Sequence, residues 1–183
     1  MKTVPIYLVL IVPGEQRTTR MHTVRVAREI DAPKSEIWRI LDDFGGVSKY
    51  SPGVETSGIV DGPDTGVGAV RECHLDEGGR IAERIVEYDD GSSFTVEFVD
   101  MGDFPLKENI VQLAVREIDA NRSEVTMTGR FTPKFGPVGW LLAKVMMKSK
   151  LEETFGDTLA GLEEYVKNQT APSGEAEVEA AEP

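Results

Sequence analysis

Few residues of this chain could carry acid–base or metal chemistry. His22 and His74 are its only histidines, and neither has a second histidine and a carboxylate at the spacing of metal ligands. His74 could act as a general acid or base near neutral pH, but its place between Cys73 and Leu75 predicts a side chain that points outward. We therefore predict no metal and no cofactor, and His74 is kept as a catalytic candidate only.

Nucleophilic catalysis has weak support. Cys73 is the only cysteine, so an intrachain disulfide and a thiolate zinc site are both excluded. In an apolar strand such a cysteine is more often a small buried hydrophobe than a nucleophile, and no base can be identified beside it in the sequence. The lone thiol is compatible with a reducing cytoplasm, where we expect the protein.

The charge balance argues against nucleic acid as a partner. Acidic residues outnumber basic ones 32 to 20, which gives a net charge of -12, and such a surface repels a phosphate backbone. Four glutamates lie in the segment 169–183, which lacks Lys, Arg and aromatic residues. That segment is predicted to be an acidic disordered tail, because it has too little apolar surface to become ordered.

The first twenty residues are predicted to lie outside the main domain. The apolar run at 5–12 is too short to span a bilayer, which needs about 20 apolar residues. No small-x-small cleavage site follows it. Residues 1–20 are therefore either a strand-like arm or an upstream extension of a domain at 21–168, and a signal peptide is a more distant alternative.

The domain is predicted to begin with a strand and two short helices. Residues 23–30 alternate between apolar and polar types, which is typical of a half-buried strand. Asp31 and Pro33 indicate a helix start, because Asp can cap free backbone N–H groups and Pro tolerates an early helical position. The helix at 33–44 has apolar residues at helical spacing, and Gly45-Gly46 should end it before a second turn of helix at 47–50.

Six more strands and one long helix complete the predicted α+β fold. The strands are expected at 54–60, 67–75, 80–88, 93–100, 105–117 and 122–132. Their connectors are short and rich in Gly, Asp and Asn, so consecutive strands should pair antiparallel, since a parallel pair needs a long crossover. The helix at 137–167 would be about 45 Å long at about 1.5 Å per residue, enough to cross the sheet.

Three stretches of this pattern resemble a known superfamily. They are EIDAPKSEIWRILDDFGGVSKYSPGV at 29–54, GVGAVRECHL at 66–75 and GRIAERIVEYDD at 79–90. Together with the order of elements over about 21–167, they resemble the START/Bet v 1-like (SRPBCC) superfamily of the polyketide cyclase/dehydrase and lipid transport type. The resemblance implies a helix-grip fold, in which a curved seven-stranded antiparallel sheet wraps the C-terminal helix and encloses a pocket for an apolar small molecule.

Residues 66–115 are also similar to the plant abscisic acid receptors of this superfamily, chiefly in VGAVRE, in Glu83-Arg84 and in GDFPLKEN. In those receptors the loops that correspond to 76–79 and 102–105 act as gate and latch. The first loop here lacks the receptors' Ser-Gly-Leu-Pro-Ala sequence, and strand 54–60 has no Lys for a ligand carboxylate. We therefore expect a similar pocket, without the same hormone or a phosphatase partner.

Two polar residues are the candidates for orienting a ligand. The resemblance places Glu83 on the inner face of its strand, where carboxylates are rare unless paired or functional, whereas the opposite strand phase would leave it in solvent. Asn109 is in phase with Val111 and Val115, so it lies near the pocket mouth if those residues face inward. A surface position beside the turn is the alternative for Asn109.

The rest of the predicted lining is apolar or weakly polar. It comprises Cys73, Leu75, Phe94, Val96, Phe98, Phe104, Leu106, Val111, Met127, Leu142 and Met146. A stripe of apolar residues more often forms a packed core than a ligand site, but the adaptable side chains of Met127 and Met146 favour a cavity.

The favoured hypothesis is binding or transfer of a lipid, polyketide or isoprenoid-like molecule without catalysis. The alternative is a cyclase, aromatase or dehydratase in which Glu83 and His74 move protons on the bound molecule. Transient membrane contact through Phe104 and the lysines at 144–150 is a third possibility, although those lysines could equally form a solvated helix face balanced by Glu152 and Glu153.

Overall fold

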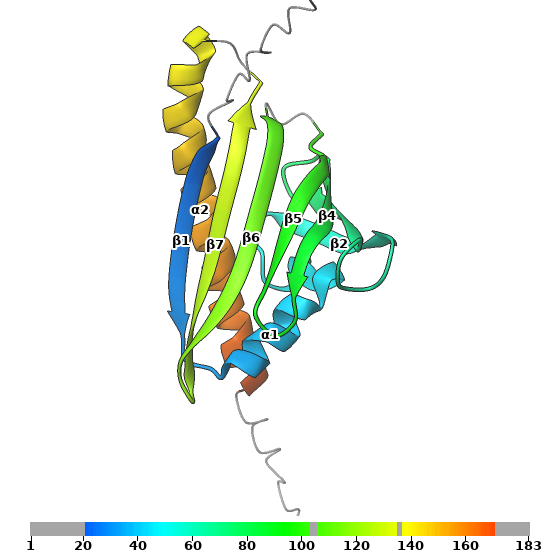
Figure 1. Cartoon of the computed structure of the whole chain (residues 1–183), viewed down its shortest axis with the longest axis vertical. Helices are drawn as coiled ribbons and strands as arrows, with labels where there is room; N and C mark the ends of the chain where they lie inside the picture. The colour runs from blue at the N-terminus through cyan, green and yellow to red at the C-terminus, as the bar shows by residue number, and fades with distance from the viewer. Residues whose placement is uncertain (1–20, 103–105, 135–136, 171–183) are drawn as a thin grey trace, which may run out of the picture.

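The computed structural model describes residues 21–102, 106–134 and 137–170, except for the side chains of residues 133, 137–146 and 170. Figure 1 shows the arrangement of the elements. They are β1 (His22–Ile30), α1 (Lys34–Asp42), the 3-10 helix η1 (Phe44–Lys49), β2 (Val54–Asp61), β3 (Val70–Leu75), β4 (Arg80–Asp89), β5 (Ser93–Asp100), β6 (Leu106–Asp119), β7 (Arg122–Pro133) and α2 (Pro137–Thr170).

The seven strands form one antiparallel sheet in the order β1-β7-β6-β5-β4-β3-β2. β2 to β7 follow one another as a meander, and β1 returns beside β7. α2 packs on β1 and β7, while η1 contacts β2 and β3 and α1 contacts β6, so the helices lie against one side of the sheet (Figure 1). The predicted α+β helix-grip fold is confirmed, and the strands begin and end within a few residues of their expected positions.

The start of α1 differs from the expectation. Pro33 is the N-cap residue, and no side chain caps the helix. The predicted capping role of Asp31 is therefore wrong, because Asp31 lies before the cap. Pro33 has no N–H to satisfy, and its carbonyl accepts the first helical hydrogen bonds from Glu36 and Ile37 at 3.1 and 3.3 Å.

The glycine pair interrupts the helical segment as expected. α1 ends at Asp42, and η1 is kinked at Gly46, whose φ of -91° and ψ of 16° are non-helical, so a second short turn follows the pair. A Cβ atom on Gly46 would lie 2.3 Å from Oδ2 of Asp43, so a larger residue there would require that exposed carboxylate to move.

The C-terminal half of α2 is held against the segment between η1 and β2. A Cβ on Gly161 would lie 2.1 Å from the backbone oxygen of Tyr50, so the two backbones touch. The hydroxyls of Ser51 and Thr158 share a buried hydrogen bond of 3.0 Å beside this contact. The helix is therefore anchored to that segment by close backbone packing as well as by its apolar side chains.

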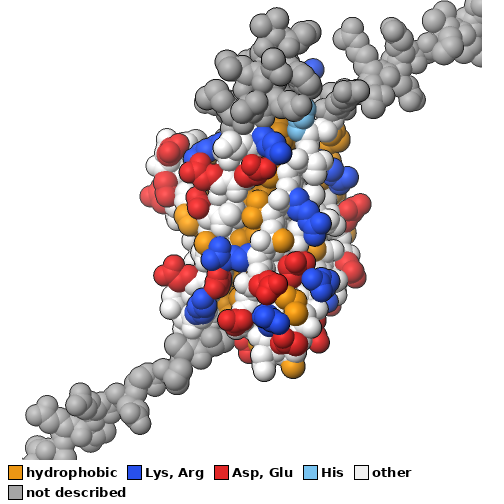
Figure 2. Space-filling model, turned by 90° about the vertical axis from the view of Figure 1, so that its left-hand side faces the viewer, with side chains coloured by type: hydrophobic (Ala, Val, Ile, Leu, Met, Phe, Trp, Pro, Cys, Tyr) orange, Lys and Arg blue, Asp and Glu red, His pale blue; other side chains and the backbone are white. Residues whose placement is uncertain are grey.

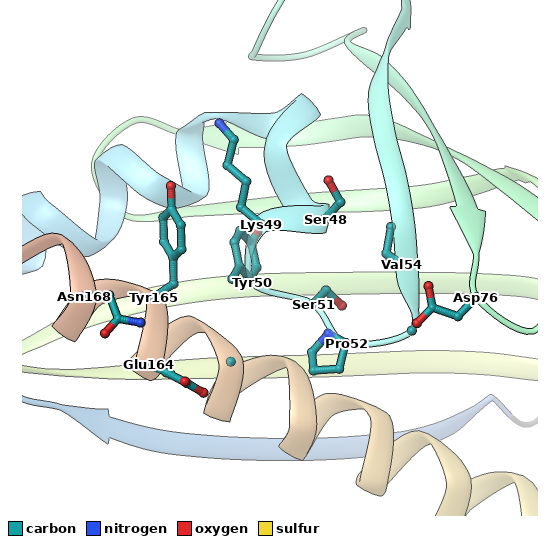
Figure 3. Close-up of a pocket in the computed structure, with 12 residues that line it drawn as sticks. Ser48, Lys49, Tyr50, Ser51, Pro52, Val54, Asp76, Glu164, Tyr165 and Asn168 are labelled. Atoms are coloured by element: carbon teal, nitrogen blue, oxygen red, sulfur yellow. The ribbon is translucent and has the colours of Figure 1, made fainter.

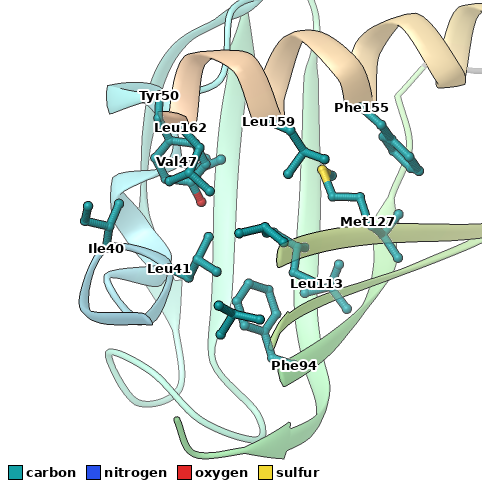
Figure 4. Close-up of a cluster of buried hydrophobic side chains, with 14 of the residues drawn as sticks. Ile40, Leu41, Val47, Tyr50, Phe94, Leu113, Met127, Phe155, Leu159 and Leu162 are labelled. Carbon is teal, nitrogen blue, oxygen red and sulfur yellow. The ribbon is translucent and has the colours of Figure 1, made fainter. Parts of the chain in front are cut away.

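The core lies between α1, α2 and the concave side of the sheet. Figure 4 shows Phe155, Leu159 and Leu162 of α2 on one side of this cluster and Met127 and Leu113 of the sheet on the other. The side chains with the least exposure are Phe44, Phe94, Phe131, Ile30, Ile37, Leu41, Ile85, Leu159, Leu162, Val24, Val96 and Val125.

Candidate ligand-binding site

Two charged side chains meet on the inner side of the sheet. Arg71 of β3 and Glu83 of β4 are direct cross-strand partners, and each is only 6% exposed. The Nε of Arg71 donates to Oε2 of Glu83 at 2.6 Å, and its Nη2 lies 2.6 Å from the same oxygen. Mutual pairing is what keeps both charges in the core, since a buried unpaired charge costs several kcal/mol.

Arg71 also has partners on η1. Its Nη1 donates to the carbonyl oxygen of Phe44 at 2.9 Å, and its guanidinium carbon lies 4.3 Å from the centre of the Phe44 ring. Burial is the largest influence on the pKa of Arg71 and lowers it, but the Glu83 charge, together with smaller contributions from Cys73, Tyr50 and the hydrogen bond to Glu83, raises the pKa overall. Arg71 is therefore a permanent cation whose donors are directed at Glu83 and Phe44.

Tyr50 and Cys73 lie next to this ion pair. Burial raises the pKa of Tyr50 to about 12, and the Arg71 charge only partly offsets the effect. Burial likewise raises the pKa of Cys73 to about 11. Both groups are neutral at physiological pH, so Tyr50 can donate a hydrogen bond and Cys73 is a poor nucleophile.

Asn109 is a buried amide on the same side of the sheet. It is 5% exposed, opposite Phe131 of β7 in the register. Its Oδ1 is fully buried and has no hydrogen-bond partner within the described residues. A buried acceptor without a partner costs about 1–3 kcal/mol, so this oxygen calls for a partner such as a water molecule, an ion or a bound ligand.

Several apolar side chains around Glu83 and Asn109 keep part of their surface exposed. Phe98 lies opposite Glu83 in the register of β4 and β5 and is half-buried, as are Ile81 and Met101. Among the described residues, the helix contacts fall mainly on β1, β7, β6, β2 and β3. Trp38 of α1 and Phe44 of η1 pack on the Tyr88 and Phe94 end of β4 and β5, and Glu83 and Phe98 lie toward the other end of these strands.

The predicted lining residues fall into three groups. Cys73, Phe94, Val96, Leu106, Val111 and Met127 are buried, and Leu75 and Phe98 are half-buried. Phe104 lies outside the described residues, and so do the side chains of Leu142 and Met146. Phe94 packs on Trp38 and Phe44, with ring centres 6.3 and 5.8 Å apart, so it belongs to the packed core rather than to open space.

His74 lies on the outer side of the sheet. Its side chain is 54% exposed, and its Nε2 lies 3.1 Å from Glu72, whose carboxylate also contacts Arg80 at 2.8 Å. Since side chains alternate along a strand, His74 points away from its neighbours Cys73 and Leu75. The catalytic role considered for His74 inside a pocket is incompatible with this placement.

Two shallow hollows lie outside the core. One, of about 370 Å³, lies between the η1–β2 segment and the end of α2; Figure 3 shows Lys49, Tyr165, Glu164 and Asp76 around it. The other, of about 380 Å³, lies between α1 and α2. Lys49 is paired with Asp43 at 2.5 Å, and the linings are polar and open, which does not suit an apolar ligand.

The face formed by β1 and α2 carries charged side chains of both signs around a narrow run of exposed hydrophobic atoms (Figure 2). On α2, Lys148 and Lys150 lie 3.5 and 3.3 Å from Glu152 and Glu153. These pairs favour the solvated, charge-balanced interpretation of the lysines over a membrane-binding cluster. No helix in the described part of the chain has the length and apolar character needed to cross a membrane.

The sequence analysis missed Arg71 and Tyr50 as site residues. The sequence did contain a signal for Arg71. This residue lies two positions from Cys73 on the same strand, so the expectation that Cys73 faces inward places Arg71 on the inner face as well. Tyr50 gave no comparable signal, since its position depends on how η1 folds back over β3. No group of three or more His, Cys, Asp or Glu side chains in the described ranges could hold a metal ion.

The family model for polyketide cyclase/dehydrase and lipid transport matches residues 21–167. The chain belongs to this family. The match spans β1 to nearly the end of α2 and so includes Arg71, Glu83 and Asn109. No curated protein matches the sequence closely enough to be reported as a relative.

Solved structures with this fold are distant in sequence. The Zhui aromatase/cyclase from Streptomyces sp. R1128 is 17% identical over 85% of this chain and 99% of its own, with a TM-score of 0.71. A START superfamily protein from Mycobacterium smegmatis is 15% identical over 81% and 99%, with a TM-score of 0.68. A norcoclaurine synthase point mutant from Thalictrum flavum, solved with a transition-state analogue, is 15% identical over 84% and 99%, with a TM-score of 0.65.

The similarities to solved structures show the fold alone, and they leave the ligand open. The finer resemblance to the abscisic acid receptors stays a prediction, as do the gate and latch roles of 76–79 and 102–105.

Proposed function

We propose that this protein binds or transfers an apolar or amphipathic small molecule between its sheet and α2, with Glu83 and Asn109 orienting the polar end of that molecule. The observation that carries the proposal is the Oδ1 of Asn109, which is fully buried without a partner. A ligand that donates a hydrogen bond to this oxygen would remove an unfavourable free-energy term of the empty protein.

The surroundings of Asn109 support the same proposal. The half-buried Phe98, Ile81 and Met101 offer apolar surface beside two polar groups, Glu83 and Asn109. A mostly apolar site with a few convergent polar groups is the usual composition of a small-molecule pocket. Membership of a family named for lipid transport and polyketide cyclases is consistent with a ligand of this kind.

Native mass spectrometry of the purified protein, followed by a thermal-shift screen of apolar compounds, tests the proposal. We expect a co-purifying small molecule, or compounds that raise the melting temperature, because a ligand that binds only the folded state stabilises it. If nothing co-purifies and no compound raises the melting temperature of the wild type, the proposal is wrong.

A matched pair of variants locates the site. Phe98→Lys places a charge on the inner face of β5, and Val99→Lys makes the same change at the next residue, which is 42% exposed. We expect Phe98→Lys to abolish the thermal shift and Val99→Lys to keep it. Loss of the shift in both variants would mean that it does not come from the inner face.

A second candidate function is catalysis of a cyclisation or dehydration. It is favoured by one observation, the grouping of Tyr50, Arg71 and Glu83, which offers a proton donor, a cation and a carboxylate close together. Incubating a bound compound with wild type and with Glu83→Gln separates the two functions. A change in its mass with the wild type alone favours the enzyme, and an unchanged mass with both favours binding.

A further inference from the structure

The two stretches of α2 on either side of Gly156 are packed very differently. In 147–154 no side chain is buried: Met147 and Leu151 are half-buried and the other side chains are exposed. In 157–166, the side chains that are at most 5% exposed are those of Thr158, Leu159, Leu162 and Val166. Because tertiary packing supplies most of the stability of a helix in a protein, the two stretches differ in how firmly they are held.

Polar contacts show the same difference. Glu163 is paired with Arg28 of β1, and Thr158 shares its buried hydrogen bond with Ser51. The ion pairs and the side-chain hydrogen bond of 147–154 join residues of α2 to one another, and none in the described part of the chain reaches another element. The C-terminal stretch is therefore fixed to β1 and to the η1–β2 segment, whereas 147–154 lacks such attachments.

Gly156 lies at the boundary between the two stretches. A Cβ atom there would meet nothing within 4 Å, so packing does not require a glycine at this position, unlike at Gly161, where the Cβ would lie 2.1 Å from the Tyr50 oxygen. A glycine inside a helix lowers its stability relative to alanine, because the glycine backbone has more conformational freedom to lose. Gly156 is therefore a point at which α2 can bend at low cost.

The stretch 147–154 lies over the end of the sheet that carries Asn109. Phe155 packs on β7, where a Cβ atom on Gly129 would lie 2.8 Å from its ring. Two residues further along β7 is Phe131, which is the register partner of Asn109. Figure 1 shows that α2 begins at the end of the sheet where β1 also begins, so the residues before Phe155 extend toward the row of Phe131 and Asn109.

From this difference we infer that α2 bends at Gly156, so that 147–154 acts as a lid that swings away from the sheet while 157–166 stays fixed. Among the described side chains of the lid, only the two half-buried ones have to leave the core, and segments with few buried contacts open most easily. The movement uncovers the Asn109 end of the inner face. The bending does not depend on the proposed function, but its role as the entrance for a ligand rests on it.

Double electron–electron resonance on the full chain tests the bending without a ligand. In a Cys73→Ala background, which removes the only native thiol, spin labels at Arg25 and Lys148 report on the lid, and labels at Arg25 and Glu164 report on the fixed stretch. All three labelled positions are exposed. We expect a second, longer distance for the first pair and a single distance for the second pair. A single distance of the same width in both pairs would overturn the inference.

Gly156→Ala should stiffen the hinge. The preference of a helix for alanine over glycine corresponds to about a fivefold change in the ratio of bent to straight helix, so the longer distance should become about fivefold less populated. Ser149→Ala is the matched control, because it also raises helix propensity but lies on the exposed face of the lid, away from the hinge. An equal effect of both variants would show fraying of the whole stretch and refute a hinge at Gly156.

Stopped-flow fluorescence with the neutral apolar probe N-phenyl-1-naphthylamine tests the role of the lid as an entrance. We expect Gly156→Ala to slow association and dissociation about fivefold each and to change Kd by less than about twofold, because the hinge controls access rather than the contacts of the bound molecule. Ser149→Ala should leave both rates unchanged. Unchanged rates in Gly156→Ala would refute the entrance and leave the proposed function standing. If the wild type does not bind the probe, the proposed function and the entrance both fail, and the spin-label distances alone decide whether α2 bends.

Discussion

The contact between Arg71 and Glu83 predicts a large coupling free energy, measurable by a double-mutant cycle with Arg71→Met and Glu83→Leu. Each single variant leaves one charge of a pair that is 6% exposed without its partner. Breaking a buried ion pair in this way costs about 3–5 kcal/mol, most of which is the desolvation of the remaining charge.

The double variant removes that penalty because no charge is left. The double variant should lose no more than about 2 kcal/mol of unfolding free energy, because it still lacks the hydrogen bond from Arg71 to Phe44 and the contact of Arg71 with the Phe44 ring. The sum of the two single losses minus the loss of the double variant then gives a coupling free energy between Arg71 and Glu83 of at least about 4 kcal/mol.

Urea denaturation at pH 7, followed by circular dichroism, gives the four free energies of unfolding. A second cycle on the same two strands is the control: Arg84 and Glu97 are 3.3 Å apart on the outer side of the sheet, and both side chains are 44% exposed. That exposed pair should couple by less than about 1 kcal/mol. If both cycles give the same small coupling, the assignment of a buried interdependent pair is refuted.

Three further predictions concern stability and reactivity. Burial raises the pKa of Tyr50 in the folded protein to about 12 from its ordinary 10.0, so the folded protein keeps this proton at pH values where the unfolded chain has lost it. The free energy of unfolding should therefore fall between pH 10 and 12. In urea titrations, Tyr50→Phe should flatten this decrease. Gly161→Ala should lower the free energy of unfolding by about 1–3 kcal/mol, because the new Cβ would collide with a backbone oxygen. Gly156→Ala on the same helix meets nothing within 4 Å and should raise the free energy of unfolding by up to about 1 kcal/mol. Similar melting temperatures for the two variants would contradict the close helix contact. His74→Ala should change neither ligand affinity nor turnover, and a loss in either assay would return His74 to the site.

Local patterns were sufficient for the elements of the fold. Alternation of apolar and polar residues and the Gly and Asp turns predicted all the strands, because side-chain period and turn conformation depend on neighbouring residues alone. The start of α1 was misjudged for the same kind of reason. Pro33 and Asp31 are compatible with several cap positions, and the packing of the first turn decides which one is used.

The candidate site was only partly predictable. The resemblance of the surrounding sequence to the superfamily pattern predicted that Glu83 faces inward, and its side chain is buried there. Its partner Arg71 comes from the neighbouring strand, and the pairing depends on a register that short-range patterns do not specify. Tyr50 reaches the same cluster only because η1 turns back over β3, a contact between segments that are distant along the chain.

The sequence by itself determined the order of strands and helices, the α+β class and the absence of a disulfide or thiolate zinc site. Tertiary structure decided how the buried charges are used. The close approach of β3, β4 and η1 commits Arg71 to Glu83 and Phe44, so this cation is paired within the protein. The physical reason is that desolvation forces a buried charge to find a partner, and which partner it finds depends on distances that only the folded chain sets.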